Sequence, residues 1–195
     1  MRLLCLGDSL TEGTVGVGFI PFLQELLPGN EYVNLGVNGE TIRGLRRRAE
    51  RLKMRGDAAI VWIGTNDVLL YPDWERHAVS AAADFAAILR LAGERAGKVL
   101  AVPPLLADPA LAREYAQSYK AATDLVRVLS VKVSAVYVDV QAVFARFPGT
   151  EFTIDGAHLN NAGARLAAET IAQHLRSLSD AELPGHQEHQ ADRVT

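Results

Sequence analysis

The sequence predicts an α/β fold built around a parallel β-sheet, and two observations lead to this prediction. Short apolar runs of strand length alternate along the chain with longer amphipathic stretches of helix length. The apolar runs are rich in Val, Ile and Leu and lack strict polar alternation, which is typical of strands that are covered on both faces. This alternation favours successive β-α-β units with right-handed crossovers.

Five strands and five longer helices are expected. The expected strands are Leu3–Leu6, Tyr32–Leu35, Ala58–Ile63, Val99–Val102 and Val133–Val138. The expected helices are Phe19–Leu27, Ile42–Lys53, Glu75–Ala96, Pro109–Ser130 and Asn161–Leu178. We expect one domain over residues 1–178. The polar residues 179–195 have almost nothing to bury, so we expect a disordered C-terminal tail there.

Composition excludes several classes of protein. Of the 195 residues, 49% are hydrophobic and 22% are charged, which is ordinary for a soluble globular domain. The net charge of −3 gives no basic surface for nucleic acid. The single cysteine, Cys5, has no partner for an internal disulfide. No apolar run approaches the roughly 20 residues of a membrane helix, and the run after Arg2 is too short for a signal peptide. We expect a cytoplasmic protein with no integral membrane segment and no nucleic-acid partner, and its oligomeric state stays open.

Small and polar residues follow the first three expected strands. They are the segments Gly7–Ser9, Gly36–Gly39 and Gly64–Asp67. Ligands of open parallel sheets bind beyond the carboxyl ends of the strands, so these segments are expected to share one functional rim.

Ser9 and His158 are the candidates for nucleophilic catalysis. A serine hydroxyl becomes a good nucleophile when a nearby base takes its proton, and Ser9 stands on the turn after the first strand. His158 lies in a loop three residues after Asp155, which is close enough in a turn for the carboxylate to orient the ring. Two plainer interpretations remain open: Ser9 as a turn residue or helix N-cap, and Asp155-Gly156 as a simple turn.

Gly39 and Asn66 are the candidates for oxyanion stabilisation. A backbone N–H at a glycine and a side-chain amide are both suitable donors to a developing negative charge. The alternatives are that Gly39 serves a turn with positive φ, and that Asn66 is a turn or cap residue in competition with Asp67.

Taken together, four segments resemble the blocks of the SGNH hydrolase superfamily, also called the GDSL esterases and lipases. They are Gly7-Asp8-Ser9-Leu10, the segment ending at Gly39, Gly64-Thr65-Asn66-Asp67, and Asp155-Gly156-Ala157-His158. Their order and spacing agree from the first strand to the last helix. The resemblance implies a three-layer α/β/α sandwich of flavodoxin-like type with a five-stranded parallel sheet.

The resemblance also implies roles for individual residues. Ser9 would be the nucleophile, His158 the base and then the acid, and Asp155 the orienting carboxylate. Ser9 N–H, Gly39 N–H and the Asn66 amide would form an oxyanion hole, with Asp8 as a support residue of the turn. The resemblance implies a small-molecule ester substrate, no metal and no organic cofactor. The family includes esterases, lipases, thioesterases, lysophospholipases and carbohydrate deacetylases, so it does not select the acyl group.

Two other functions fit the same kind of sheet. Gly13, Gly16 and Gly18 form a glycine-rich segment that would suit a flavodoxin-like nucleotide- or flavin-binding module, although their spacing is not that of a dinucleotide fingerprint. Asp8 and Asp67 follow strands, as in a phospho-receiver module, but this interpretation leaves His158 without a role.

Three further groups of side chains remain to be placed. Tyr71 and Trp74 are candidates for lining an apolar substrate pocket, or for packing on the surface of the domain. A basic cluster lies on the second expected helix and either attracts an anionic ligand or forms a solvated face. Its members are Arg43, Arg46, Arg47, Arg48 and Arg51. His186 and His189 in the tail lack the further ligands of a metal site.

Overall fold

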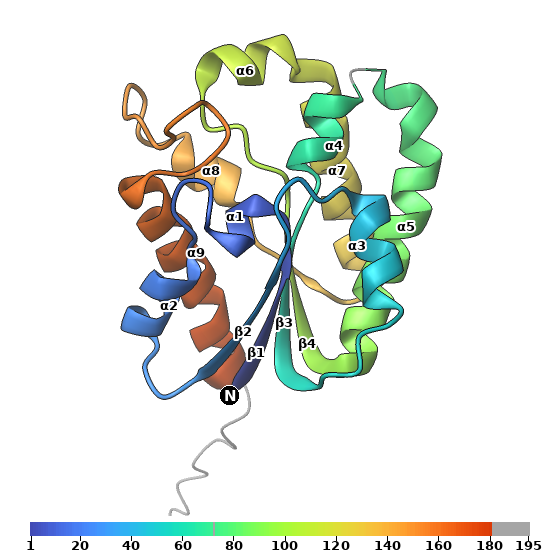
Figure 1. The fold of residues 1–195 in the computed structure, drawn as a ribbon, viewed down its shortest axis with the longest axis vertical. Helices are drawn as coiled ribbons and strands as arrows, with labels where there is room; N and C mark the ends of the chain where they lie inside the picture. Colours follow the sequence, from blue (N-terminus) through green and yellow to red (C-terminus); the bar gives the residue numbers. More distant parts are fainter. Residues whose placement is uncertain (72, 181–195) are drawn as a thin grey trace, which may run out of the picture.

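The computed structural model describes residues 1–71 and 73–180 and shows a five-stranded sheet between two layers of helices (Figure 1). The strands are β1 (Arg2–Gly7), β2 (Glu31–Gly36), β3 (Gly56–Trp62), β4 (Ala96–Val102) and β5 (Val136–Tyr137). Their order is β2-β1-β3-β4-β5, and every neighbouring pair is parallel. The predicted three-layer α/β/α sandwich of flavodoxin-like type with a five-stranded parallel sheet is confirmed.

The helices connect the strands and cover both faces of the sheet. They are α1 (Ser9–Glu12), α2 (Ile20–Leu26), α3 (Ile42–Ala49), α4 (Thr65–Leu70), α5 (Trp74–Arg95), α6 (Pro109–Glu114), α7 (Ala116–Lys132), α8 (Val140–Phe144) and α9 (Asn161–Asp180). Helices α2, α8 and α9 cover one face, and α3, α5 and α7 cover the other (Figure 1).

Side chains that alternate along each strand build two separate cores. On β1, Leu3 and Cys5 pack against the α2 and α9 layer, whereas Leu4 and Leu6 pack against the α3 and α5 layer. The sheet is therefore apolar on both faces, which explains the absence of polar alternation in its strands. Burial raises the pKa of the Cys5 thiol to about 12, so this cysteine acts as a small core residue.

The observed elements differ from the predicted ones mainly in short segments. The strand expected at Val133–Val138 is reduced to β5, because the turn after α7 continues as far as Ala135, whose N–H donates to Ser130 O. The helix expected at Pro109–Ser130 is interrupted at Tyr115. Helix α9 continues to Asp180, and the rest of the expected tail, residues 181–195, lies outside the described residues.

Candidate active site

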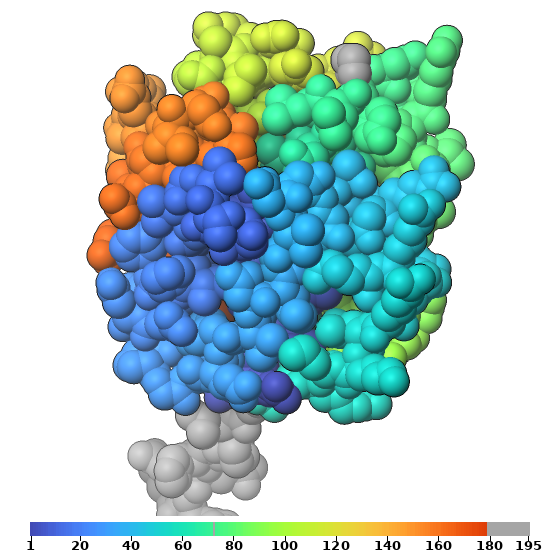
Figure 2. Space-filling view, viewed as in Figure 1, coloured from blue at the N-terminus to red at the C-terminus, as the bar shows by residue number. Residues whose placement is uncertain are grey.

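The carboxyl ends of three neighbouring strands form the rim where the predicted site residues gather. In the sheet register, Gly7 at the end of β1 is paired with Gly36 of β2 and with Trp62 of β3. The chain order reverses between β1 and β3, which is where doubly wound sheets open a crevice for ligands. Figure 2 shows the dark blue segment after β1 against orange residues of the loop before α9 and blue residues of the segment after β2.

Ser9 is the first residue of α1, directly after β1. The N-cap of this helix is Asp8, whose Oδ1 accepts a hydrogen bond of 3.0 Å from Leu10 N–H. Asp8 therefore performs the capping that one interpretation assigned to Ser9. The Ser9 hydroxyl is not needed to cap the helix, although Ser9 is only 5% exposed.

Asp155 and His158 form a closely bonded pair in the loop before α9. Asp155 Oδ2 lies 2.6 Å from His158 Nδ1, and Asp155 Oδ1 accepts from the backbone N–H groups of Ala157 and His158 at 3.1 and 2.8 Å. Partial burial opposes ionisation of Asp155. The three hydrogen bonds outweigh it and hold the pKa of Asp155 below its usual value. The carboxylate thus shapes the turn and fixes the imidazole ring at the same time.

The glycine-rich segment after α1 ties the His158 loop to the part of the chain that carries Ser9. Val17 N–H donates to Leu159 O at 2.8 Å. Gly16 has a φ of +72°, and a Cβ at this position would lie 2.6 Å from Leu159 O and 3.0 Å from the His158 Cβ. Gly16 therefore allows two segments far apart in sequence to approach closely, and this contact accounts for the glycine without a bound nucleotide.

Gly39 and Asn66 are brought together by a direct hydrogen bond between their segments. Asn66 Nδ2 donates to the carbonyl oxygen of Glu40 at 2.9 Å. Gly39 has a φ of +71°, and no atom lies within 4 Å of the position that a Cβ would take. The backbone there is open to an approaching ligand. The N-cap of α4 is Gly64, so Asn66 is not a capping residue.

Two carboxyl groups, those of Asp8 and Asp67, are fully buried at this rim. Burial raises the pKa of Asp8 to about 7; the hydrogen bond from Leu10 N–H opposes this shift, and the charges of Asp67 and Glu40 add to it. Asp8 Oδ2 has no hydrogen-bond partner within the described part of the chain. Ionised Asp8 therefore destabilises the folded state.

We expect Asp8→Asn to reduce the loss of stability between pH 5 and pH 8. Unfolded Asp8 releases its proton near pH 3.8, whereas folded Asp8 keeps it up to about pH 7. The unfolded state thus binds fewer protons in this window, and wild-type stability falls as the pH rises toward 7. Urea unfolding at both pH values should show wild type losing about 2–3 kcal/mol more than the variant. Equal losses in the two proteins would contradict the raised pKa.

The candidates for substrate contact differ in their exposure. Trp74 is buried in the core between the sheet and α5, whereas Tyr71 is 41% exposed at the end of α4.

In the basic cluster, Arg48 is paired with Glu40 and Arg46 with Glu50. Arg46 therefore forms an ion pair with the C-cap residue of its own helix, and Arg48 binds the segment that follows Gly39.

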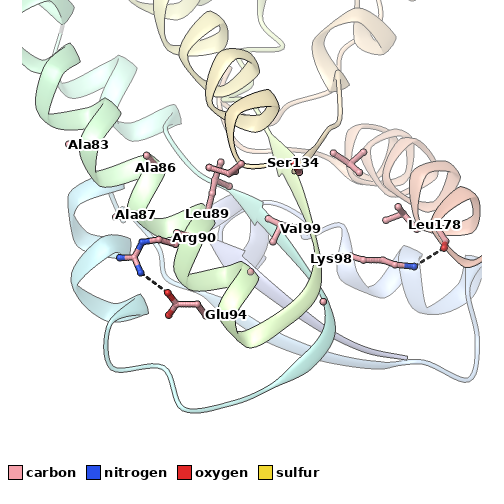
Figure 3. Close-up of a pocket in the computed structure, with 14 residues that line it drawn as sticks. Ala83, Ala86, Ala87, Leu89, Arg90, Glu94, Lys98, Val99, Ser134 and Leu178 are labelled. Carbon is pink, nitrogen blue, oxygen red and sulfur yellow. Dashed lines mark hydrogen bonds and ion pairs between the residues drawn. The ribbon is translucent and has the colours of Figure 1, made fainter. Parts of the chain in front are cut away.

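A cavity of about 820 Å³ lies away from this rim (Figure 3). Its lining includes Lys98 at the beginning of β4 and Val136 at the beginning of β5, so it is near the opposite end of the strands. Its charged side chains are already engaged: Arg90 pairs with Glu94, and Lys98 donates to Leu178 O. This cavity contains none of the residues that the sequence singles out for catalysis.

Two kinds of feature are absent from the part of the chain that the structure describes. Across residues 1–71 and 73–180, no helix is both long and apolar enough to cross a membrane. The same residues contain no group of three or more His, Cys, Asp or Glu side chains arranged to hold a metal ion.

Comparison with solved structures shows the same fold in several hydrolases. An acetylxylan esterase from Geobacillus stearothermophilus is 21% identical with a TM-score of 0.72, and 89% of this chain and 93% of that chain are covered. An α/β hydrolase from the metagenome of Lake Arreo, Spain, is 20% identical with a TM-score of 0.75, covering 91% and 95%. A lipolytic G-D-S-L family member from Veillonella parvula DSM 2008 is 17% identical with a TM-score of 0.75, covering 89% and 97%.

Comparison by sequence identifies the family. No curated protein matches the chain. The model of the GDSL-like lipase/acylhydrolase family matches residues 5–166, a range that begins in β1 and ends inside α9. All four segments around Ser9, Gly39, Asn66 and His158 fall within it. The chain belongs to the GDSL-like lipase/acylhydrolase family and is an ester-hydrolysing enzyme.

Proposed function

We propose that the protein is a serine esterase that cleaves carboxylic esters through an acyl-enzyme. The observation that carries this proposal is the Asp155–His158 pair, with 2.6 Å between Asp155 Oδ2 and His158 Nδ1. The carboxylate holds one ring nitrogen, which leaves Nε2 as the nitrogen that accepts and returns a proton. Ser9, whose hydroxyl is released from capping by Asp8, is the nucleophile.

The reaction proceeds in two displacements. His158 Nε2 takes the Ser9 proton as Oγ attacks the ester carbonyl carbon, and the carbonyl oxygen becomes an oxyanion. The carbon–oxygen bond to the alcohol then breaks, and the alcohol leaves with the proton from His158. Water attacks the acyl-enzyme with His158 again as base, the acid is released, and Ser9 regains its proton.

The oxyanion hole in this proposal consists of Ser9 N–H, Gly39 N–H and the Asn66 amide. Ser9 is at the first position of a helix, where the N–H has no partner within the helix. The backbone at Gly39 is open to a ligand, and the Asn66 side chain is fixed beside it by its bond to Glu40 O. Donors held in this way stabilise the charge of the tetrahedral intermediate without moving.

A covalent inhibitor tests the nucleophile directly. We expect diethyl p-nitrophenyl phosphate to add one diethylphosphoryl group per chain, and peptide mass spectrometry should place it on Ser9. Ser177→Ala is the matched control, because Ser177 is an exposed serine on α9 that donates to Gln173 O. This variant should label like wild type. A modified residue other than Ser9, or labelling that persists in Ser9→Ala, would overturn the assignment.

A second candidate function is deacetylation of carbohydrates. It is favoured by the structural neighbour from Geobacillus stearothermophilus, which is an acetylxylan esterase. A series of p-nitrophenyl esters from acetyl to palmitoyl separates the candidates. Turnover confined to the acetyl ester supports deacetylation, whereas turnover of long chains supports the lysophospholipase and thioesterase alternatives. In either case Tyr71 is the exposed aromatic side chain proposed to contact the substrate.

A further inference from the structure

A buried side chain links the segments that carry Gly39 and Asn66. Asp67 is fully buried, and its two carboxylate oxygens have different partners. Oδ2 accepts from Ile42 N–H at 2.9 Å, and Oδ1 lies 3.3 Å from His77 Nε2. The Asp67 carboxylate thus joins α4, the N-terminus of α3 and the first turns of α5.

Three contacts of the segment Gly39–Ile42 involve side chains of residues outside the segment. Asn66 Nδ2 donates to Glu40 O, Arg48 is paired with the Glu40 carboxylate, and Asp67 accepts from Ile42 N–H. Two of these three contacts come from the neighbouring residues Asn66 and Asp67. Asn66 and Asp67 thus hold the backbone immediately after Gly39, at Glu40 and Ile42.

His77 contacts Oδ1 of Asp67, the carboxylate oxygen that Ile42 N–H does not use. Its ring stacks on Tyr71 with centroids 4.2 Å apart and meets the Trp74 ring edge-on at 5.8 Å. These contacts fix the imidazole, and Nε2 is directed at Asp67 Oδ1. Burial raises the pKa of Asp67, while the Ile42 N–H and the His77 ring favour its ionised form.

We propose that His77 is a positioning residue that fixes the Asp67 carboxylate and thereby aligns the Gly39 N–H and the Asn66 amide as one rigid pair of oxyanion donors. This inference rests on the proposed function. His77 does not contact the reacting atoms, so its removal should lower turnover and leave substrate binding nearly unchanged. A small misplacement of both donors weakens interactions that form only in the transition state.

His77→Phe and His77→Gln separate hydrogen bonding from packing. Phe keeps a ring against Tyr71 and removes the donor to Asp67, whereas Gln loses the ring and keeps an amide nitrogen near the position of Nε2. We expect His77→Phe to lower kcat for p-nitrophenyl acetate about 10-fold with KM within about 2-fold. His77→Gln should recover at least half of the wild-type kcat. If His77→Phe does not fold, His77→Ala with added imidazole supplies the same comparison.

His174→Phe is the matched control, because the His174 ring faces Thr170 O within its own helix, α9. It should keep wild-type kcat. Wild-type kcat in His77→Phe, or equal losses in the Phe and Gln variants, would overturn the positioning role.

A second readout does not depend on activity. Hydrogen–deuterium exchange of the Ile42 amide should be faster in His77→Phe than in wild type and unchanged in His174→Phe. Unchanged exchange in His77→Phe would overturn the inference. Absence of ester hydrolysis by the wild-type protein would instead reject the proposed function, and the exchange experiment would still decide whether His77 holds the segment.

Discussion

Replacing Ser9 with Ala is expected to lower kcat for p-nitrophenyl acetate by at least about 10³-fold. Without Oγ, no acyl-enzyme forms, and only water attacking beside the remaining oxyanion donors contributes. KM should change little, because the hydroxyl forms its strongest interactions during the reaction. Steady-state kinetics with purified wild type and variant check this result.

The variant should also fold normally, and this makes the kinetic result interpretable. Asp8 caps α1, so the loss of the Ser9 hydroxyl removes no capping bond. The thermal unfolding midpoint should stay within a few degrees of wild type. Ser177→Ala controls for the loss of a serine hydroxyl elsewhere and should keep full activity. A Ser9→Ala protein with wild-type turnover would exclude Ser9 as the nucleophile and require another residue or a bound water molecule to attack the ester.

The strands and long helices could be predicted because their signals are repeated over many residues. The apolar runs of β1 to β4 extend over most of each strand. Helices α5 and α9 contain several turns of helical periodicity. The position of the rim followed from the same reasoning, since parallel strands align their carboxyl ends. Residue type and position in a turn made Ser9, Asp155 and His158 candidates, the resemblance of four segments to a family gave them their roles, and these roles remain proposals.

Short elements carried too little signal to be predicted. Helices α1, α4 and α8 contain four to six residues, less than two turns each, so no amphipathic pattern can be recognised in them. Val133 looked like the beginning of a strand because it is apolar. It instead ends α7, where its N–H donates to Leu129 O. Local hydrogen bonding determined the boundary there, and composition did not reveal it.

Contacts between side chains of different elements could not be predicted from the sequence either. The approach of His77 to Asp67 depends on how α5 begins after α4, and the burial of Trp74 depends on the packing of α5 against the sheet. The signal available in advance was weak: a histidine ten residues after the Gly64–Asp67 block. Only the arrangement of helices shows that this histidine faces the buried carboxylate.

Replacing Asn66 with Ala is expected to lower kcat by about 10²–10³-fold, the usual effect of losing one oxyanion donor. One hydrogen of the Asn66 amide is used in the bond to Glu40 O, which fixes the side chain and leaves the other available for the oxyanion. Asn66→Asp is the sharper variant, because it keeps the size of the side chain and replaces the donor with a negative charge. Its kcat should fall at least as far as that of Asn66→Ala.

Part of the loss in Asn66→Ala could arise from the missing bond to Glu40 O, and a matched asparagine separates the two contributions. Asn30 Nδ2 also donates to a backbone carbonyl, that of Leu27, at 2.9 Å, but it lies just before β2, at the end of the sheet opposite the rim. Asn30→Ala should change stability and leave kcat near wild type. If Asn66→Ala lowers stability as Asn30→Ala does yet keeps more than about a third of the wild-type kcat, Asn66 holds the Glu40 backbone and is not an oxyanion donor. A loss of 10²-fold or more with KM unchanged would instead place the Asn66 amide at the charge that develops in the transition state.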